Sequence, residues 1–120
     1  AGAEALAIAA NSMHRLYDQV ADAVDVPVLH IADAVGEKMK AAGAVNAALI
    51  GTRNVMTESF YRRKLVSHGI DLLPPDMTHV DRTNACTELD MVIDVDANVL
   101  PIFDSARIHS EAVVDWILER

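Results

Sequence analysis

Cysteine, aromatic residues and positive charge are all scarce in this sequence of 120 residues, and each shortage excludes a class of protein. A single cysteine permits neither an internal disulfide framework nor a zinc cluster held by thiolates, and it suits a reducing compartment such as the cytoplasm. The 10 Lys and Arg residues against 18 Asp and Glu give a formal charge of −8, which argues against a nucleic-acid partner because phosphates require a basic surface. No apolar run approaches the roughly 20 residues that span a bilayer, so we expect no membrane partner.

Aliphatic residues are abundant instead. Hydrophobic residues make up 52% of the sequence and aromatic residues only 4%, so the core must consist of Ala, Val, Ile and Leu. Short apolar runs alternate with segments of helical periodicity, an order that favours parallel strands joined by crossover helices. We therefore predict the α/β class, with a parallel sheet and flanking helices. The predicted strands occupy residues 5–9, 26–31, 45–50, 70–73 and 100–103, and the predicted helices occupy residues 11–24, 34–42, 57–68 and 105–118.

Local signals mark the ends of these segments. Asn11 or Ser12 is expected to cap the first helix and Ser105 the last, because such side chains accept hydrogen bonds from free backbone N–H groups. Gly43 and Gly69 are expected to end the second and third helices, since glycine tolerates left-handed backbone. Residues 51–54 are predicted to form the turn that closes the third strand.

The alternation breaks down between Pro75 and Cys86. Parallel strands need a crossover of about a dozen residues or more, and this interval is too short for both a helix and another strand. The sequence also begins within an Ala-rich segment and without an initiator Met. We therefore expect an incomplete chain, through a deletion, an engineered truncation or an omission of residues. Exposed edges of an unfinished sheet invite pairing with a second copy, so we also expect a homo-oligomer.

Two short blocks carry the chemistry. Residues 84–89, Asn-Ala-Cys-Thr-Glu-Leu, contain the only thiol, at Cys86. Residues 9–14, Ala-Ala-Asn-Ser-Met-His, have a similar shape but carry Ala10 where a thiol would match. Together they resemble the paired active-site motifs of the cofactor-independent aspartate/glutamate racemases. Further blocks fit the same family in the same order, at residues 1–4, 29–34, 50–53, 60–62, 100–104 and 108–109.

This resemblance implies a fold and an activity. Members of the family are similar to two flavodoxin-like α/β domains that face each other, with a thiol from each on opposite sides of the bound amino acid. On that plan residues 1–30 would end the first domain, residues 31–100 would form the second, and residues 101–120 would be a strand and helix that return to the first. The implied activity is racemisation of a small-molecule amino acid, aspartate or glutamate, without pyridoxal phosphate (PLP) or metal.

Cys86 is the candidate acid/base group. Racemisation removes the α-proton from one face of the carbon and returns a proton to the other, which requires two groups. A thiol suits this task because its pKa of about 8.5 can be lowered by nearby positive dipoles, although a lone cysteine is otherwise a small buried hydrophobe. Ala10 has no proton to exchange, and loss of one positioned acid/base group costs on the order of 10² to 10⁴ in rate. We therefore expect weak or no racemisation from this chain.

The resemblance also implies a cradle for the substrate α-carboxylate at strand-to-helix turns. The same residue types are ordinary helix caps, and the two roles can coexist. The candidates for the cradle are Asn11, Ser12, Thr52 and Thr87. Supporting roles, each with a purely structural alternative, fall to Arg53, Glu88, His14 and His109. His30 and His79 do not have the spacing of metal ligands, and the sequence has no Gly-rich phosphate loop or Lys-centred cofactor signature, so we expect, as the resemblance implies, neither a metal nor another cofactor.

Two other functions stay open. The related arylmalonate decarboxylases keep only the thiol of the second motif, as this chain does, but they need an apolar pocket for an aryl group. A non-catalytic fragment that retains only the carboxylate cradle is the other alternative. The blocks at residues 30–33 and 51–53 fit the racemase branch better.

Overall fold

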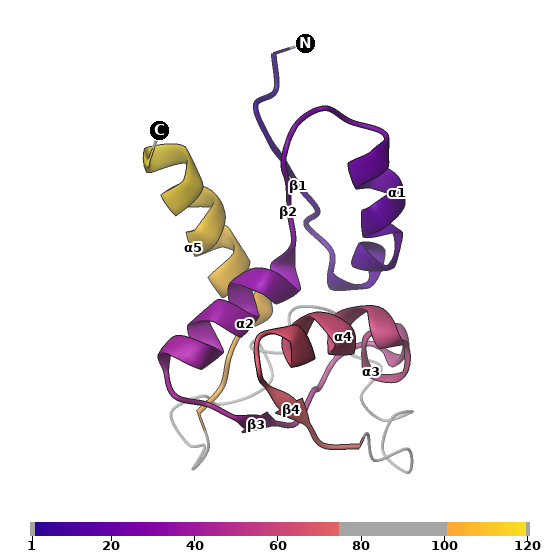
Figure 1. The fold of residues 1–120 in the computed structure, drawn as a ribbon, viewed down its shortest axis with the longest axis vertical. Helices are drawn as coiled ribbons and strands as arrows, with labels where there is room; N and C mark the ends of the chain where they lie inside the picture. Colours follow the sequence, from indigo (N-terminus) through magenta and orange to yellow (C-terminus); the bar gives the residue numbers. More distant parts are fainter. Residues whose placement is uncertain (1, 75–100, 120) are drawn as a thin grey trace.

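The computed structural model describes residues 2–74 and 101–119, in which short strands alternate with helices (Figure 1). In chain order the elements are β1 (Leu6–Ala7), the 3-10 helix η1 (Asn11–Leu16), α1 (Tyr17–Asp22), β2 (Val28–Leu29), α2 (Ile31–Ala41), β3 (Asn46–Ala47), α3 (Arg53–Thr57), α4 (Ser59–Ser67), β4 (Asp71–Leu72) and α5 (Ser105–Leu118). In these ranges no helix combines the length and the apolar character that a membrane crossing requires.

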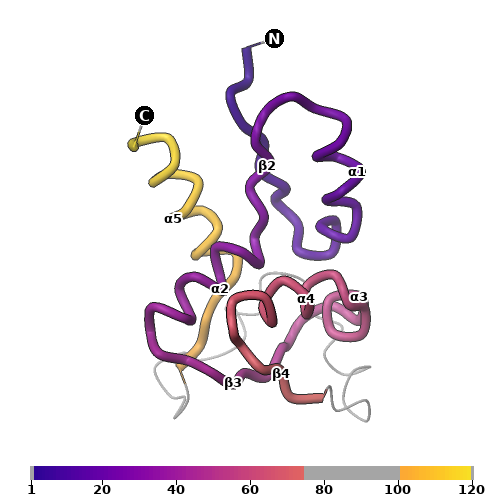
Figure 2. The backbone as a smooth tube through the Cα atoms, in the orientation of Figure 1, coloured from indigo at the N-terminus to yellow at the C-terminus, as the bar shows by residue number. Residues whose placement is uncertain are grey.

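The strands pair in parallel, as the sequence predicts. β1 pairs with β2, with Leu6 opposite Val28, and β3 pairs with β4, with Asn46 opposite Asp71. Helical crossovers join the partners: η1 and α1 lie between β1 and β2, and α3 and α4 lie between β3 and β4. The α/β prediction is confirmed, but the described strands form two separate two-stranded sheets rather than one. Because α2 connects β2 to β3, the two sheets lie on either side of it (Figure 2).

Helix α2 is the centre of the core. It contacts both α4 and α5, the helices that follow much later in the chain. Ile31, Val35 and Met39 are spaced four residues apart along α2 and are all buried, so one face of the helix points inward. The rest of the core is aliphatic as predicted, apart from one tyrosine, and consists of Ala32, Val55, Tyr61, Leu65, Ile70, Leu72 and Ile108.

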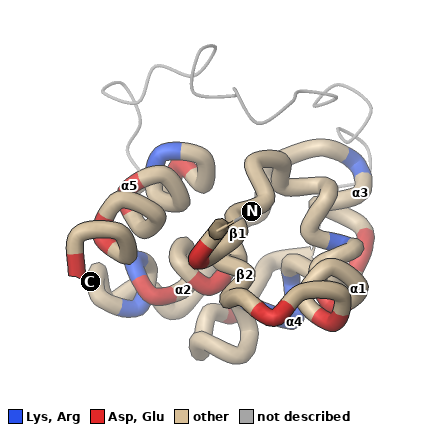
Figure 3. The backbone as a smooth tube through the Cα atoms, turned by 90° about the horizontal axis from the view of Figure 1, so that it is seen from above, with Lys and Arg blue, Asp and Glu red and all other residues tan. Residues whose placement is uncertain are grey.

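Charged residues are spread over the helices, acidic on α1, basic on α4 and of both signs on α2 and α5 (Figure 3). Among the described residues the buried polar side chains are of other types, one amide and three imidazoles: Asn11, His14, His30 and His109. Burying a polar group is unfavourable unless hydrogen bonds compensate for the lost water. These four residues therefore need an explanation, and they lie at the ends of β1 and β2 and on the first turns of α5.

The predicted helix caps are wrong at both ends of the chain. The N-cap of η1 is Ala10, and no side chain caps it, whereas Asp104 caps α5 by accepting hydrogen bonds from two backbone N–H groups. Asn11 lies inside η1 rather than before it, and the two predicted caps bond to each other instead, with Asn11 Nδ2 donating to Ser105 Oγ over 2.8 Å. In contrast, Gly43 and Gly69 do follow α2 and α4 with φ of 74° and 81°, as predicted.

Three predicted boundaries also differ from the structure. Helix α2 starts at Ile31, three residues earlier than predicted, because His30 Nδ1 accepts a hydrogen bond from the Ala32 N–H at 3.1 Å. The turn predicted at residues 51–54 gives way at Arg53 to helix α3, and extended backbone at Glu58 separates this helix from α4, which starts at Ser59 rather than at residue 57. Residues 101–103 are not a strand; Leu100, the first residue of that predicted strand, lies outside the described residues.

Candidate functional site

Ala10 lies at the turn where β1 gives way to η1. Its backbone is extended, with φ of −117° and ψ of 125°, and its side chain is half-buried. The Ala10 carbonyl accepts hydrogen bonds from the Met13 N–H at 3.1 Å and from His14 Nδ1 at 3.0 Å. Position 10, which the sequence motif predicts to correspond to a catalytic thiol, is therefore held in place by the following helical turn.

His14 connects this turn to the start of α2. Its Nε2 accepts a hydrogen bond from the Ile31 N–H at 3.1 Å, so its Nδ1 carries the proton that is donated to Ala10. Burial lowers the pKa of His14, which favours this neutral tautomer. Both ring nitrogens of His14 thus form hydrogen bonds with backbone groups, and His14 links the turn after β1 to the start of α2.

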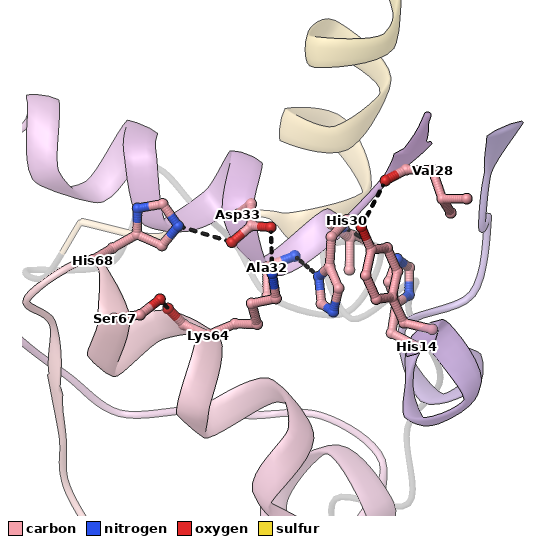
Figure 4. A network of polar contacts seen from close by, with 10 residues as sticks. His14, Val28, His30, Ala32, Asp33, Lys64, Ser67 and His68 are labelled. Atoms are coloured by element: carbon pink, nitrogen blue, oxygen red, sulfur yellow. Dashed lines mark hydrogen bonds and ion pairs between the residues drawn. The ribbon is translucent and has the colours of Figure 1, made fainter. Parts of the chain in front are cut away.

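Two more histidines pack against His14, and Figure 4 shows one of them, His30, beside it. The ring centroids of His14 and His30 are 4.6 Å apart, and those of His14 and His109 are 5.8 Å apart. Burial, followed by repulsion from His14, lowers the pKa of His30 to about 4, and burial also lowers the pKa of His109. This histidine cluster, His14, His30 and His109, is therefore neutral at pH 7. In the described part of the chain, no group of three or more His, Cys, Asp or Glu side chains is arranged to hold a metal ion.

A second polar contact joins Asn11 to α5. Asn11 Nδ2 donates to Ser105 Oγ over 2.8 Å, and the buried Tyr61 of α4 lies near Ser105. Burial raises the pKa of Tyr61, so its hydroxyl stays protonated. The remaining acceptor of the amide, Asn11 Oδ1, is buried and has no hydrogen-bond partner among the residues that the structure describes.

Thr52 occupies the corresponding turn after β3. It is the N-cap of α3, but its hydroxyl makes no capping bond, and within residues 2–74 and 101–119 the buried Oγ1 has no partner. Helix η1 contacts α3 and α4, so the Asn11 turn lies against the element that Thr52 begins. Two strand-to-helix turns therefore each supply a buried polar atom that is available to a ligand.

The other predicted site residues fall into two groups. Ser12 is half-buried on η1, and Arg53 is the exposed first residue of α3. Cys86, Thr87 and Glu88 lie outside the described residues. Sequence reasoning missed Ser105, Tyr61 and His30 as members of the site; their only signal was that they fall within or beside the blocks at residues 29–34, 60–62 and 100–104.

A charged network holds α4 against α2 beside the histidine cluster (Figure 4). Asp33 Oδ2 accepts a hydrogen bond from Lys64 Nζ at 2.8 Å, and Asp33 Oδ1 lies 2.9 Å from His68 Nε2. Burial acts to raise the pKa of Asp33, but the hydrogen bonds from Lys64 and His68 outweigh it and lower the pKa. The Lys64 ammonium also lies 5.4 Å from the centre of the Tyr17 ring, within the range of a cation–π contact.

A mainly apolar hollow lies between β1 and α5, away from the polar residues described above. It measures about 370 Å³ and is lined by residues that include Leu6, Leu29, Val113 and Trp116. None of the polar residues described above lines it. The polar turns, rather than this hollow, are the candidate site.

Parallel α/β proteins bind their ligands at the carboxyl ends of the strands, which is where Asn11 and Thr52 lie. The sequence model of the family described as "Asp/Glu/Hydantoin racemase" matches residues 1–100. The chain therefore belongs to the Asp/Glu/hydantoin racemase family, as the two motifs predict.

Individual relatives agree with this assignment. The broad-specificity amino-acid racemase RacX of Bacillus subtilis is 22% identical over 151 residues, which include 98% of this chain and 66% of RacX. The crystal structure of a candidate Asp/Glu racemase from Yersinia pestis superposes with a TM-score of 0.89 at 28% identity, covering 98% of this chain and 67% of that one. An aspartate racemase homologue from Pyrococcus horikoshii gives 0.86 at 27% identity, covering 96% and 67%. This chain thus spans just under two thirds of the length of RacX.

Proposed function

We propose that this chain carries the substrate site of a PLP-independent amino-acid racemase that acts on aspartate or glutamate. The observation that carries the proposal is the pair of buried polar atoms, Asn11 Oδ1 and Thr52 Oγ1, which find no partner in the described ranges. An unsatisfied buried polar group costs about 1–3 kcal/mol, so its retention is explained by a ligand that satisfies it. A hydroxyl donor and an amide acceptor suit the carboxylate and the ammonium of an α-amino acid.

The proposed carboxylate cradle combines hydroxyl groups with backbone N–H groups. Asn11 contributes through its backbone N–H, and the hydroxyls come from Ser12, Thr52 and Thr87. Arg53 follows Thr52 directly and is proposed to attract the acidic side chain of the substrate. The sequence motif supports Thr87, and the turn geometry supports Asn11 and Thr52.

Proton transfer is assigned to the thiol of Cys86, with Glu88 orienting it. On this proposal the thiolate takes the α-proton from one face, and a second thiol at position 10 would return a proton on the other. Ala10 is rigidly held by His14 but has no proton to give. The chain as written should therefore exchange the α-proton on one face without inverting the carbon.

Ala10→Cys tests this mechanism. Incubation of L-aspartate in D₂O should give α-deuterium incorporation with little D-aspartate for the original chain. Ala10→Cys should raise the rate of inversion by roughly 10²- to 10⁴-fold, because it restores a positioned acid/base group. Ala10→Ser is the matched control: it has nearly the same size and no acidic thiol. The mechanism is wrong if Ala10→Cys and Ala10→Ser invert aspartate equally fast, or if Cys86→Ala still exchanges deuterium.

The arylmalonate decarboxylase alternative predicts a different ligand. Ala10 favours it, since that chemistry needs a single thiol, but the polar lining contributed by Asn11, Thr52 and Ser105 favours an amino acid over an aryl group. Titration calorimetry with aspartate, glutamate and phenylmalonate separates the alternatives. Saturable heat and CO₂ release with phenylmalonate alone would replace the racemase proposal, and binding of the amino acids without deuterium exchange would indicate a non-catalytic binding fragment.

The assembly is also a proposal. We assign residues 1–30, which hold β1 and β2, to the end of a first domain, residues 31–100 to a second domain, and residues 101–120 to a return segment. This division is supported by the separation of the two sheets. The short strand pairs leave edges that favour a homo-oligomer in the cytoplasm. Light scattering of the purified chain that gives a stable monomer would contradict the oligomer.

A further inference from the structure

The two ends of the Asn11 amide have different surroundings. Asn11 is 8% exposed, and its Nδ2 donates to Ser105 Oγ over 2.8 Å, a bond between residues 94 positions apart. Its Oδ1 is equally buried but has no partner in the part of the chain that the structure describes. The amide nitrogen is thus bound to the protein, and the amide oxygen can accept a hydrogen bond from a ligand.

Ser105 is itself held in place. It is the first residue of α5, a helix that packs against α2 and whose Ile108 belongs to the buried core. The buried Tyr61 of α4 lies near enough for the Ser105 side chain to affect its pKa. The hydrogen bond from Asn11 on η1 therefore ends on a side chain that the packing of α5 anchors.

An amide oriented in this way offers a hydrogen-bond acceptor and no donor to a ligand. A carboxylate has only acceptors when ionised, so Asn11 Oδ1 would repel it. An ammonium has only donors, and a bond between a charged and a neutral group is the stronger kind of hydrogen bond. The group that suits this position on an amino acid is its α-ammonium.

We propose that Ser105 is a positioning residue that turns the Asn11 side chain so that Oδ1 accepts a hydrogen bond from the α-ammonium of the bound amino acid. This inference rests on the proposed function and makes it more specific. The Asn11 side chain thereby distinguishes amino acids from plain dicarboxylates, while the carboxylate is held by the other groups of the cradle.

The test compares aspartate with succinate, the same dicarboxylate without the ammonium. Titration calorimetry gives Kd for both ligands on the original chain, Ser105→Ala, Ser105→Thr and Ser110→Ala. Ser105→Ala should weaken aspartate roughly 10-fold, the effect of one lost charge-assisted bond, and change succinate less than about 2-fold. Ser105→Thr keeps the hydroxyl and should restore the preference. Ser110 is the matched control, since its hydroxyl bonds the Ala106 carbonyl on the exposed side of the same helix.

The ratio of the two dissociation constants is the decisive quantity, because a general loosening of the fold would weaken both ligands together. An equal loss for aspartate and succinate in Ser105→Ala, or an unchanged ratio, overturns the role of Ser105 and leaves the racemase proposal standing. If the original chain binds neither ligand, both proposals fall. Should Ser105→Ala fail to fold by circular dichroism, Ser105→Thr against Ser105→Val gives the same comparison at matched side-chain size.

Discussion

Gly36 permits a close approach between α2 and His68 at the end of α4, and replacing it with alanine should destabilise the protein. A Cβ at position 36 would lie 2.6 Å from both Cγ and Cδ2 of His68 and 2.9 Å from its Cβ. The imidazole cannot easily move away, because its side chain is only 19% exposed and its Nε2 is 2.9 Å from Asp33 Oδ1. The added methyl therefore displaces a ring that is bonded to α2.

Two opposing effects set the size of the change. Alanine is favoured over glycine inside a helix by up to about 1 kcal/mol. Overpacking typically costs about 1–3 kcal/mol, and a contact of 2.6 Å with a ring belongs toward the upper end. We therefore expect Gly36→Ala to lower the free energy of unfolding by roughly 1–2 kcal/mol. Urea unfolding followed by circular dichroism measures this difference.

A second background makes the reasoning refutable. In a His68→Gly protein both the obstructing ring and the Cβ atom that carries it are gone, so Gly36→Ala should now stabilise by roughly 0.5–1 kcal/mol through helix propensity alone. The same substitution thus changes sign between the two backgrounds. If Gly36→Ala has the same effect with and without His68, the close approach does not govern stability, and the packing of α2 against α4 has been misread.

The remaining predictions concern the histidine cluster and the last helix. Because the pKa of His30 falls from 6.5 to about 4 on folding, the unfolded chain binds more protons in this window. The contribution of neutral His30 to the free energy of unfolding is therefore complete above pH 6.5, and about 3 kcal/mol of it is lost as the pH falls toward 4. His30→Asn should make the free energy of unfolding less dependent on pH in this range, because asparagine can still cap α2 but does not titrate. His14→Phe keeps an aromatic ring at this position but leaves the Ile31 N–H without its acceptor. The midpoint of urea unfolding should therefore fall by the equivalent of about 1–3 kcal/mol, and an unchanged midpoint would contradict a stabilising role for His14. Asp104→Ala should lower the free energy of unfolding by about 1 kcal/mol, because α5 loses its N-cap, whereas the control Ser110→Ala should lower it by less than about 0.5 kcal/mol. Equal decreases for the two variants would argue that the cap does not stabilise the helix.

The parts of the fold that follow from local pattern were predictable. Alternating apolar runs and helical periodicity gave the α/β class, and Gly43 and Gly69 end their helices through left-handed backbone that glycine adopts without strain. Residues 53–57 were not predictable in this way, because nothing in that short segment distinguishes one helical turn from a loop. The buried Val55 shows that core packing stabilises this turn.

The site divides along the same line. Ala10, Asn11 and His14 occupy one turn, so the motif alone brought them together. The sequence did not predict whether Asn11 and Ser105 would cap helices or bond to other side chains. Both are good cap residues, and they bond to each other only because the fold brings together residues that are 94 positions apart.

The sequence by itself determined the family, the alternation of strand and helix, and the presence of one thiol with an alanine at the matching position, because these are properties of neighbouring residues. Only the tertiary structure decided which polar atoms are satisfied and which remain available. Hydrogen-bond partners are selected by proximity in space, and the meeting of η1 with the start of α5 brings together Asn11 and Ser105, which no local pattern connects.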